Sequence, residues 1–427
     1  MKTTFPSRCS TLLLSLAVSS GFAATVLAAP QAPVRAQEPL AGERAIEPFQ
    51  RDLLSLAFRA ASSVPVEPHR KTRSRLQESV VTTLLDLDQP SLAIEYAQHI
   101  GDWRRGSVYA DFAFWCAQHG ARERAQEYLS YADQLAMDVG NDPNPQSWRR
   151  DTIRLKIARA YQFLDEPAKA AEFARGTEAT SGLAYDPVLA STAASLADKV
   201  EASALDADLE RIDEVLIGEA SGQAYNALVT CTRLYDRFFA DADRRAAIEK
   251  RIRIGNSKLP PNLRLAAYIE VGDIAARKGD EAKPVALAAY RQARDFYEAT
   301  EWTPEAAISF VPRLASLRHR VGESDGARDD LEQALVRYRD LRAGFRSTTR
   351  AEILRPFAEA FHTLGLDARS ADIWALVIEE GVENPNSRPR SEDIVGTCLA
   401  MAKCRYEPTA ELSARLREVV DGLGDPW

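Results

Sequence analysis

Two histidines, His319 and His362, are the residues whose type and spacing most clearly suggest chemistry. They lie 43 residues apart, and each follows a small residue, Ala315 or Ala358, by four positions. Arginines and glutamates recur near both, and such a set could hold an extended peptide or an acidic terminus through charge-assisted hydrogen bonds. A zinc pair is less well supported, because no third ligand is evident. The alternative interpretation is that these residues form solvated polar faces of amphipathic helices.

The sequence contains no motif for catalysis or nucleotide binding. It has no HExxH, CxxC or GxSxG motif and no glycine-rich phosphate loop. Neighbouring carboxylates such as Glu379 and Glu380 point apart on a helix, so they suit paired acid–base chemistry poorly. We therefore expect a protein that is not an enzyme and that uses no cofactor and no metal.

The charge pattern excludes another class of partner. The net charge is −8, and it is spread along the chain without a block of five or six like charges. A nucleic-acid-binding protein needs a basic surface to neutralise phosphates. We therefore expect no nucleic acid partner.

The elements that must position the histidines repeat along the chain. Three glycines, Gly279, Gly322 and Gly365, are spaced 43 residues apart. Seven positions before each glycine lies a small residue, and after each comes a large apolar residue followed by a small or branched one: Gly272, Ala315 and Ala358, then Tyr290 and Ala293, Leu331 and Ala334, Trp374 and Val377. Self-similarity at a fixed period of this size is typical of stacked helical hairpins. The stretch from 268 to 377 is therefore predicted to hold three hairpins that turn at the glycines.

The rest of the chain shows the same helical periodicity. The composition is 45% hydrophobic and 27% charged, as in soluble folded proteins, and Ala and Leu carry most of the apolar content. No run shows the apolar–polar alternation of a strand. We expect an all-α protein without a sheet, in which residues 48–427 form an α-solenoid of about nine helical hairpins after a leading helix. A globular helical bundle without repeats is the alternative. The best-defined repeats are 104–137, 148–176, 263–299, 304–341 and 347–381.

The N-terminal residues predict export. Lys2 and Arg8 precede an apolar stretch from 11 to 27, and Val26, Leu27 and Ala28 fit a signal peptidase site. We expect a signal peptide at 1–28, a flexible Pro/Ala-rich leader at 29–47, and a periplasmic or extracellular location. A membrane anchor is the alternative, but the apolar stretch is short for a stable span. No later stretch could be an integral membrane segment.

Four cysteines remain after cleavage at Ala28. Cys116 and Cys231 lie in helical stretches among apolar neighbours, which favours buried free thiols. Cys398 and Cys404 are six residues apart, so a disulfide between them would require a break in the helix.

These hairpins resemble tetratricopeptide repeats, a family of helical hairpins with a degenerate pattern of large and small residues. The best matches are Tyr109, Phe112, Ala113, Gly120, Ala125, Leu129 and Ala132 in one hairpin, and Leu314, Ala315, Gly322, Ala327, Leu331 and Ala334 in another. Leu354, Phe357, Ala358, Phe361, Gly365 and Trp374 also match, whereas Ser370 and Val377 replace expected alanines. The period is 43 residues here, against about 34 in the family. The resemblance implies a right-handed superhelix with a concave groove lined by the first helix of each hairpin.

The resemblance also implies which residues line that groove. The main candidates are Asp273, Arg277, Ser316, His319, Arg320, Arg355, Glu359 and His362. Ser309, Pro312, Glu352 and Thr363 would join them, and Phe114, Gln118, Arg159 and Gln162 would come from the N-terminal hairpins. We expect an exported, non-catalytic scaffold that binds a protein or peptide in this groove. The alternative is a secreted enzyme that acts on polysaccharides and is built on a closed ring of helical hairpins.

Overall fold

The computed structural model describes residues 40, 42–140, 147–175, 177, 194–217 and 221–427, all of which belong to one compact unit, residues 32–427. Within these ranges the chain is helical and contains no strand, which confirms the predicted all-α class. The predicted signal peptide at 1–28 and most of the leader lie outside the described residues. No described helix is both long enough and apolar enough to cross a bilayer.

The helices follow one another as α1 (Pro48–Ser63), α2 (Arg70–Asp86), α3 (Pro90–Ala97), α4 (Arg104–Gln118), α5 (Arg122–Gly140), α6 (Ser147–Phe163), α7 (Pro167–Ala174), α9 (Leu205–Ile217), α10 (Ser221–Arg237), α11 (Ala242–Ser257), α12 (Pro261–Arg277), α13 (Lys283–Ala299), α14 (Pro304–Arg320), α15 (Ser324–Leu341), α16 (Ser347–Thr363), α17 (Asp367–Val382), α18 (Ser387–Cys404) and α19 (Ala410–Asp421). A short 3₁₀ turn, Asp280–Ala282, precedes α13, and another, Arg342–Gly344, follows α15. α18 begins at Ser387 and holds Pro389 in its first turn, where proline is tolerated.

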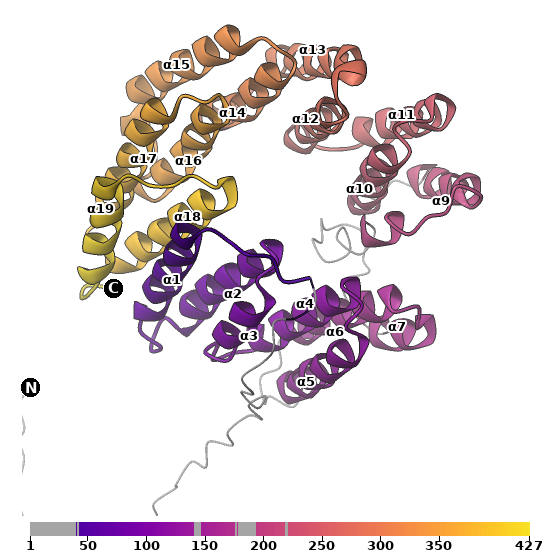
Figure 1. The fold of residues 1–427 in the computed structure, drawn as a ribbon, viewed down its shortest axis with the longest axis horizontal. Helices are drawn as coiled ribbons and strands as arrows, with labels where there is room; N and C mark the ends of the chain where they lie inside the picture. Colours follow the sequence, from indigo (N-terminus) through magenta and orange to yellow (C-terminus); the bar gives the residue numbers. More distant parts are fainter. Residues whose placement is uncertain (1–39, 41, 141–146, 176, 178–193, 218–220) are drawn as a thin grey trace, which may run out of the picture. The chain divides into compact units, whose positions relative to one another are not determined.

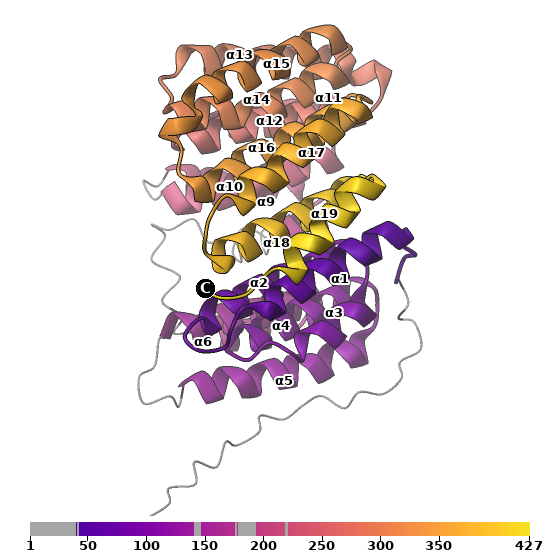
Figure 2. The same ribbon diagram turned by 90° about the vertical axis from the view of Figure 1, so that its left-hand side faces the viewer.

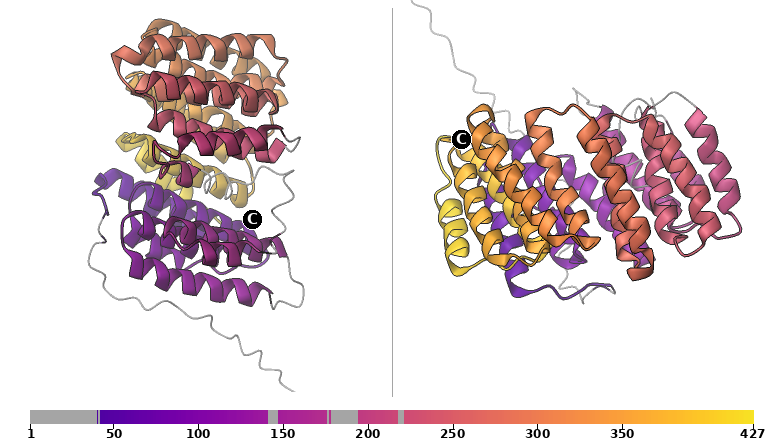
Figure 3. Two further views of the ribbon diagram at one scale, coloured as in Figure 1. Left: turned by 90° about the vertical axis from the view of Figure 1, so that its right-hand side faces the viewer. Right: turned by 90° about the horizontal axis from the view of Figure 1, so that it is seen from above.

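The helices form a tandem array of hairpins. Each hairpin pairs one helix with the helix that follows it (Figure 1). The pairs are α2–α3, α4–α5, α6–α7, α10–α11, α12–α13, α14–α15 and α16–α17. Even-numbered helices also pack against one another in sequence, from α2 to α4 to α6 and from α10 through α12, α14 and α16 to α18. The hairpins between 221 and 341, pink to orange in Figure 3, lie stacked with their axes side by side. We call α2, α4, α6, α10, α12, α14, α16 and α18 the first helices.

The three predicted turn glycines are confirmed. Gly279, Gly322 and Gly365 have φ angles of 93°, 99° and 73°, and Gly120 has 75° at the equivalent turn between α4 and α5. L-residues with a side chain rarely adopt such angles, so glycine is favoured there. Gly120, Gly322 and Gly365 mark the same backbone turn, closed by a hydrogen bond from the residue after the glycine to a carbonyl of the first helix. Gly279 differs, because its ψ is −172° and it leads into the 3₁₀ turn Asp280–Ala282.

Other hairpins make this turn without glycine. Asp88 ends α2 with a φ of 55°, Asp165 ends α6 with 60°, and Arg405 ends α18 with 59°. Aspartate tolerates the left-handed region better than most residues because its short side chain can form local hydrogen bonds. The same turn thus recurs in the hairpins α2–α3, α6–α7 and α18–α19, whereas the described residues between α10 and α11 have no positive φ.

Small residues let neighbouring helices approach closely. A Cβ atom on Gly272 of α12 would lie 2.6 Å from a methyl carbon of Leu317 in α14, so glycine makes room for that leucine. Ser370, which replaces an expected alanine, is fully buried and donates a 2.8 Å hydrogen bond from its hydroxyl to the Ala358 carbonyl. This bond joins α17 to α16 at a position where alanine would give packing alone.

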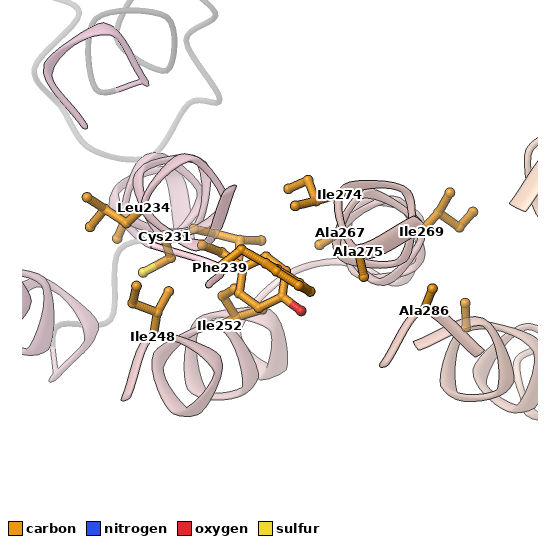
Figure 4. Packing of buried hydrophobic residues seen from close by; sticks show 14 of the residues in the cluster. Cys231, Leu234, Phe239, Ile248, Ile252, Ala267, Ile269, Ile274, Ala275 and Ala286 are labelled. Atoms are coloured by element: carbon orange, nitrogen blue, oxygen red, sulfur yellow. The ribbon is translucent and has the colours of Figure 1, made fainter. Parts of the chain in front are cut away.

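The buried residues form a core between the two helices of each hairpin and toward the next hairpin. Figure 4 shows Cys231 of α10, and Phe239 just after that helix, near Ile248 and Ile252 of α11. Cys116, Cys231 and Cys398 are buried free thiols, as predicted for the first two. Cys404 is also free. Because α18 runs without a break from Ser387 to Cys404, the condition for a bridge to Cys398 is not met.

The first described helix, α1, packs chiefly against α18, more than 300 residues later (Figure 2). The amide of Gln50, near the start of α1, donates a 2.8 Å hydrogen bond to the Ala402 carbonyl near the end of α18. The hydroxyl of Ser391, near the start of α18, donates a 2.8 Å bond to the Ala60 carbonyl near the end of α1. The last four carbonyls of a helix lack intrahelical partners, so each helix helps to cap the C-terminal end of the other.

The chain just before α1 is also held in place. The Ser91 hydroxyl donates a 2.6 Å hydrogen bond to the Glu43 carboxylate. The backbone amide of Arg44 donates to the Asp88 carbonyl at 3.1 Å, and its guanidinium pairs with the Asp88 carboxylate at 3.1 Å. Residues 43 and 44, at the end of the predicted leader, therefore lie against the turn between α2 and α3.

Candidate functional site

A network of charged groups connects α2, α4 and α6. Asp111 of α4 accepts from Lys156 at 2.6 Å and from Arg159 at 2.8 Å, both on α6. The Arg159 guanidinium also lies over the Phe114 ring, 4.1 Å from its centroid. Charged groups that are mostly buried need further hydrogen bonds to offset the loss of water. The Lys156 ammonium makes one of these by donating to the Ser107 hydroxyl at 2.7 Å.

The network continues from Ser107 to α2. The Ser107 hydroxyl donates to Glu78 at 3.0 Å, and the Arg104 guanidinium pairs with the same carboxylate at 3.0 Å. Burial raises the pKa of Glu78, against the opposing effect of Lys156 and Arg104. Three consecutive first helices are thus held in fixed register by polar groups.

A pocket of about 490 Å³ opens beside this network. Trp115 forms part of its wall and donates a 3.0 Å hydrogen bond from its indole to Asp88. His119 stacks on Trp115 with ring centroids 3.9 Å apart. The full lining is Thr82, Leu85, Asp86, Asp88, Asp111, Phe114, Trp115, Gln118, His119, Lys156 and Arg159. It combines aromatic surface with fixed charges and includes Phe114, Gln118 and Arg159 from the predicted groove.

A second pocket, of about 570 Å³, lies between α2, α16 and α18. We call it the α2–α16–α18 pocket, and its lining is Ser79, Thr82, Thr83, Glu359, Gly396, Leu399, Ala400, Lys403 and Cys404. Thr82 lines both pockets, so the two adjoin along α2. The Lys403 ammonium donates a 3.1 Å bond to Asp86, which lines the neighbouring pocket.

Arg355 and Asp393 flank this second pocket. The Arg355 guanidinium lies 3.6 Å from the Asp393 carboxylate and so close to Gly396 that a Cβ atom there would overlap it. Glycine at 396 therefore lets the guanidinium rest on the α18 backbone. Burial raises the pKa of Asp393 to about 7 and that of Glu359 to about 7, with Arg355 opposing both shifts.

Of the eight main groove candidates, Glu359 lines the second pocket and Arg355 flanks it. Asp273 and Arg320 pair with each other, joining α12 to α14. Arg277 is exposed and lies 4.0 Å from Glu270, and Ser316 is half-buried on α14. These four residues do not line the two pockets described above.

The two histidines occupy the same place in their hairpins, as the repeat predicts. His319 Nδ1 lies 2.9 Å from the Ser324 hydroxyl, and His362 Nδ1 lies 2.7 Å from the Asp367 carboxylate. Ser324 and Asp367 are the first residues of α15 and α17. Each histidine thus ties the end of a first helix to the start of the second helix, a contact that holds the hairpin turn.

Sequence analysis missed the residues that α2 and α18 bring to the second pocket. Ser79, Thr82 and Thr83 carry no motif, and their proximity to Lys403 depends on packing between distant parts of the chain. No group of three or more His, Cys, Asp or Glu side chains in the described ranges is arranged to hold a metal ion.

Comparisons with known proteins leave the family open. No protein-family model matches the chain, and no curated protein matches it. It is similar to a solved structure described as a "Circular tandem repeat protein with novel repeat topology and enhanced subunit contact surfaces". The identity is 14%, over 87% of this chain and 94% of that chain, with a TM-score of 0.23. A similarity at that TM-score carries no information about function.

Proposed function

We propose that this chain is an exported, non-catalytic helical-repeat protein of the tetratricopeptide-like kind, which binds a protein or peptide along its first helices. The recurring left-handed turn and the small residues at close helix contacts support the tetratricopeptide-like assignment. The signal-like residues at 1–28 support export.

The observation that carries the binding proposal is the pair of adjoining pockets on α18, α2, α4 and α6. They share Thr82, combine aromatic and aliphatic walls with charged groups, and have volumes of about 490 and 570 Å³. Ligand sites commonly combine apolar walls with a few polar groups held in place. Here the polar groups are held by neighbouring first helices, as an extended partner that crosses several hairpins would require.

The binding proposal is tested by finding the partner and then mapping its contacts. The tagged chain is crosslinked in its native compartment, and the proteins recovered with it are identified and purified. Amide hydrogen exchange of the chain is then measured with and without each purified partner. We expect slower exchange in α2, α4, α6 and α18. Slower exchange confined to the second helices would contradict the proposal.

A second candidate function is hydrolysis of a polysaccharide. It is favoured by Glu359 and Asp393, two carboxyl groups whose pKa burial raises to about 7, since a general acid must keep its proton near neutral pH. Reducing-sugar release from a panel of polysaccharides tests it. Release that is abolished by Glu359→Gln would favour the enzyme over the scaffold.

A further inference from the structure

Glu359 is the carboxyl group in the lining of the α2–α16–α18 pocket, and the cations next to it are paired with other carboxylates. Arg355 pairs with Asp393 at 3.6 Å, and Lys403 pairs with Asp86 at 3.1 Å. Among the described residues, the Glu359 carboxylate makes no hydrogen bond or ion pair, although Arg355 and Lys403 lie near enough to act on its pKa. An anionic group in a partly apolar pocket is costly to bury without a partner.

Two of the three hydroxyl groups that line the pocket, those of Ser79 and Thr83, and the Cys404 thiol already use their hydrogens. The Ser79 hydroxyl donates to the Leu76 carbonyl at 2.8 Å, and the Thr83 hydroxyl donates to the Ser79 carbonyl at 2.9 Å. The Cys404 thiol donates to the Met401 carbonyl at 3.5 Å. A hydroxyl that donates its hydrogen elsewhere retains lone pairs, so Ser79 and Thr83 offer acceptors to a ligand. The wall therefore suits a ligand that donates hydrogen bonds.

We propose that the α2–α16–α18 pocket binds the ammonium group of a lysine side chain from a basic peptide segment, with Glu359 as its counter-ion. This inference rests on the proposed function, since the lysine belongs to the partner that lies along the first helices. An ammonium group has three donors and no acceptor, which fits one carboxylate and two hydroxyl oxygens on different helices better than a planar guanidinium does. Leu399 and Ala400 supply apolar surface for the aliphatic stem of the lysine.

The pocket also predicts how binding depends on pH. Burial raises the pKa of Glu359 to about 7, and an ammonium group binds its ionised form. The charged and titratable groups that face Glu359 are Arg355 on the same helix and Lys403 and Cys404 on α18. Asp393 of α18 pairs with Arg355 and also has a pKa of about 7, and α2 contributes hydroxyls and Asp86, which pairs with Lys403. Lowering the pH from 8 to 6 should therefore weaken binding about tenfold as Glu359 takes up a proton.

The test uses the purified exported chain and a fluorescein-labelled tetralysine peptide at low salt, followed by fluorescence anisotropy. Glu359→Gln should raise the Kd at pH 8 about tenfold and remove most of its change between pH 6 and 8. Glu123→Gln is the matched control, because Glu123 is exposed on α5 and lies outside both pockets. It should leave the Kd and its pH dependence unchanged. The same peptide with acetylated lysines should bind at least tenfold more weakly than tetralysine.

Several results would overturn the inference. These are undetectable tetralysine binding to the wild type, equal affinity for the acetylated peptide or for tetraarginine, and equal loss in Glu123→Gln and Glu359→Gln. A purified partner that protects the first helices but binds Glu359→Gln as tightly as wild type would also overturn it, while leaving the proposed function in place. Protection confined to the second helices would instead remove the proposed function. Thermal unfolding of both variants confirms that they are folded.

Discussion

Replacing Ser391 by alanine removes a hydrogen bond on which the C-terminal end of α1 depends. The Ser391 hydroxyl is fully buried and donates a 2.8 Å bond to the Ala60 carbonyl, one of the last four carbonyls of α1. α1 ends at Ser63 without a glycine cap, so its final carbonyls rely on side chains from other helices. The guanidinium of Arg73 in α2 also caps this end of α1, because it donates hydrogen bonds to the Ser62 and Val64 carbonyls.

The expected magnitude follows from the burial of this bond. A buried carbonyl left without its hydrogen bond costs about 1–3 kcal/mol. Alanine has a somewhat higher helix propensity than serine, which recovers less than about 0.5 kcal/mol in α18. A net loss of about 2 kcal/mol in the free energy that holds α1 in place corresponds to about 30-fold faster local opening.

Amide hydrogen exchange of α1 measures this opening directly. In Ser391→Ala, the α1 amides should exchange about 30-fold faster than in wild type, while those of α12 to α15 keep their rates. Ser413→Ala is the matched control, because Ser413 is half-buried on α19 and its hydroxyl makes no hydrogen bond within the described ranges. Unchanged α1 exchange in Ser391→Ala, or equal acceleration throughout the chain, would refute the proposed role of this bond.

Three further substitutions test other parts of the fold. Glu380→Gln should cost about 2–3 kcal/mol in thermal unfolding, because this carboxylate is 2% exposed and accepts two bonds from Arg342, whereas half-exposed Glu379→Gln should cost less than about 1 kcal/mol. Gly322→Ala should cost about 1–2 kcal/mol by the same measurement, since its φ is 99°. Asp393 has a folded-state pKa of about 7, above its unfolded value, so its contribution to stability is lost as the pH rises from about 4 to 7. When the pH rises from 4 to 7, Asp393→Asn should lose less stability than the wild type does, and the two losses should differ by at most about 4 kcal/mol. If the variant loses as much stability as the wild type or more, the raised pKa of Asp393 is contradicted.

Local features of the fold were predictable from the sequence. The spacing of Gly279, Gly322 and Gly365 located three hairpin turns, because a left-handed turn demands glycine or a residue that tolerates it. The turns at Asp88 and Asp165 were also visible, because in each case a proline two residues later, Pro90 or Pro167, begins the next helix. Helix periodicity located most elements to within a few residues, because each helix buries one face against its neighbours.

Contacts between distant parts of the chain were not predictable in the same way. Nothing in the local pattern of α1 indicates that Gln50 reaches Ala402 or that Ser391 reaches Ala60, since those contacts span more than 300 residues. The α2–α16–α18 pocket depends on the same packing. Glu359 and Arg355 could therefore be proposed from their repeat positions, whereas the hydroxyls of α2 and the ammonium of Lys403 could not.

The histidines illustrate a second limit of sequence reasoning. Their 43-residue spacing correctly indicated equivalent positions, but it could not distinguish a ligand contact from a contact within the hairpin. In the structure, His319 and His362 bond to Ser324 and Asp367, five residues further along the chain. A repeated residue near a turn can be required by the turn itself.

Site-resolved crosslinking in the native compartment tests most directly the claim that the first helices bind a partner. A photo-reactive amino acid is placed, one position at a time, at Gln118 on α4, at Arg277 on α12 and at Gln333 on α15, all of which are exposed. We predict that the same partner protein is crosslinked from Gln118, more weakly from Arg277, and not from Gln333, which lies on a second helix. Crosslinks that form equally well from Gln333, or from Gln333 alone, would contradict the claim.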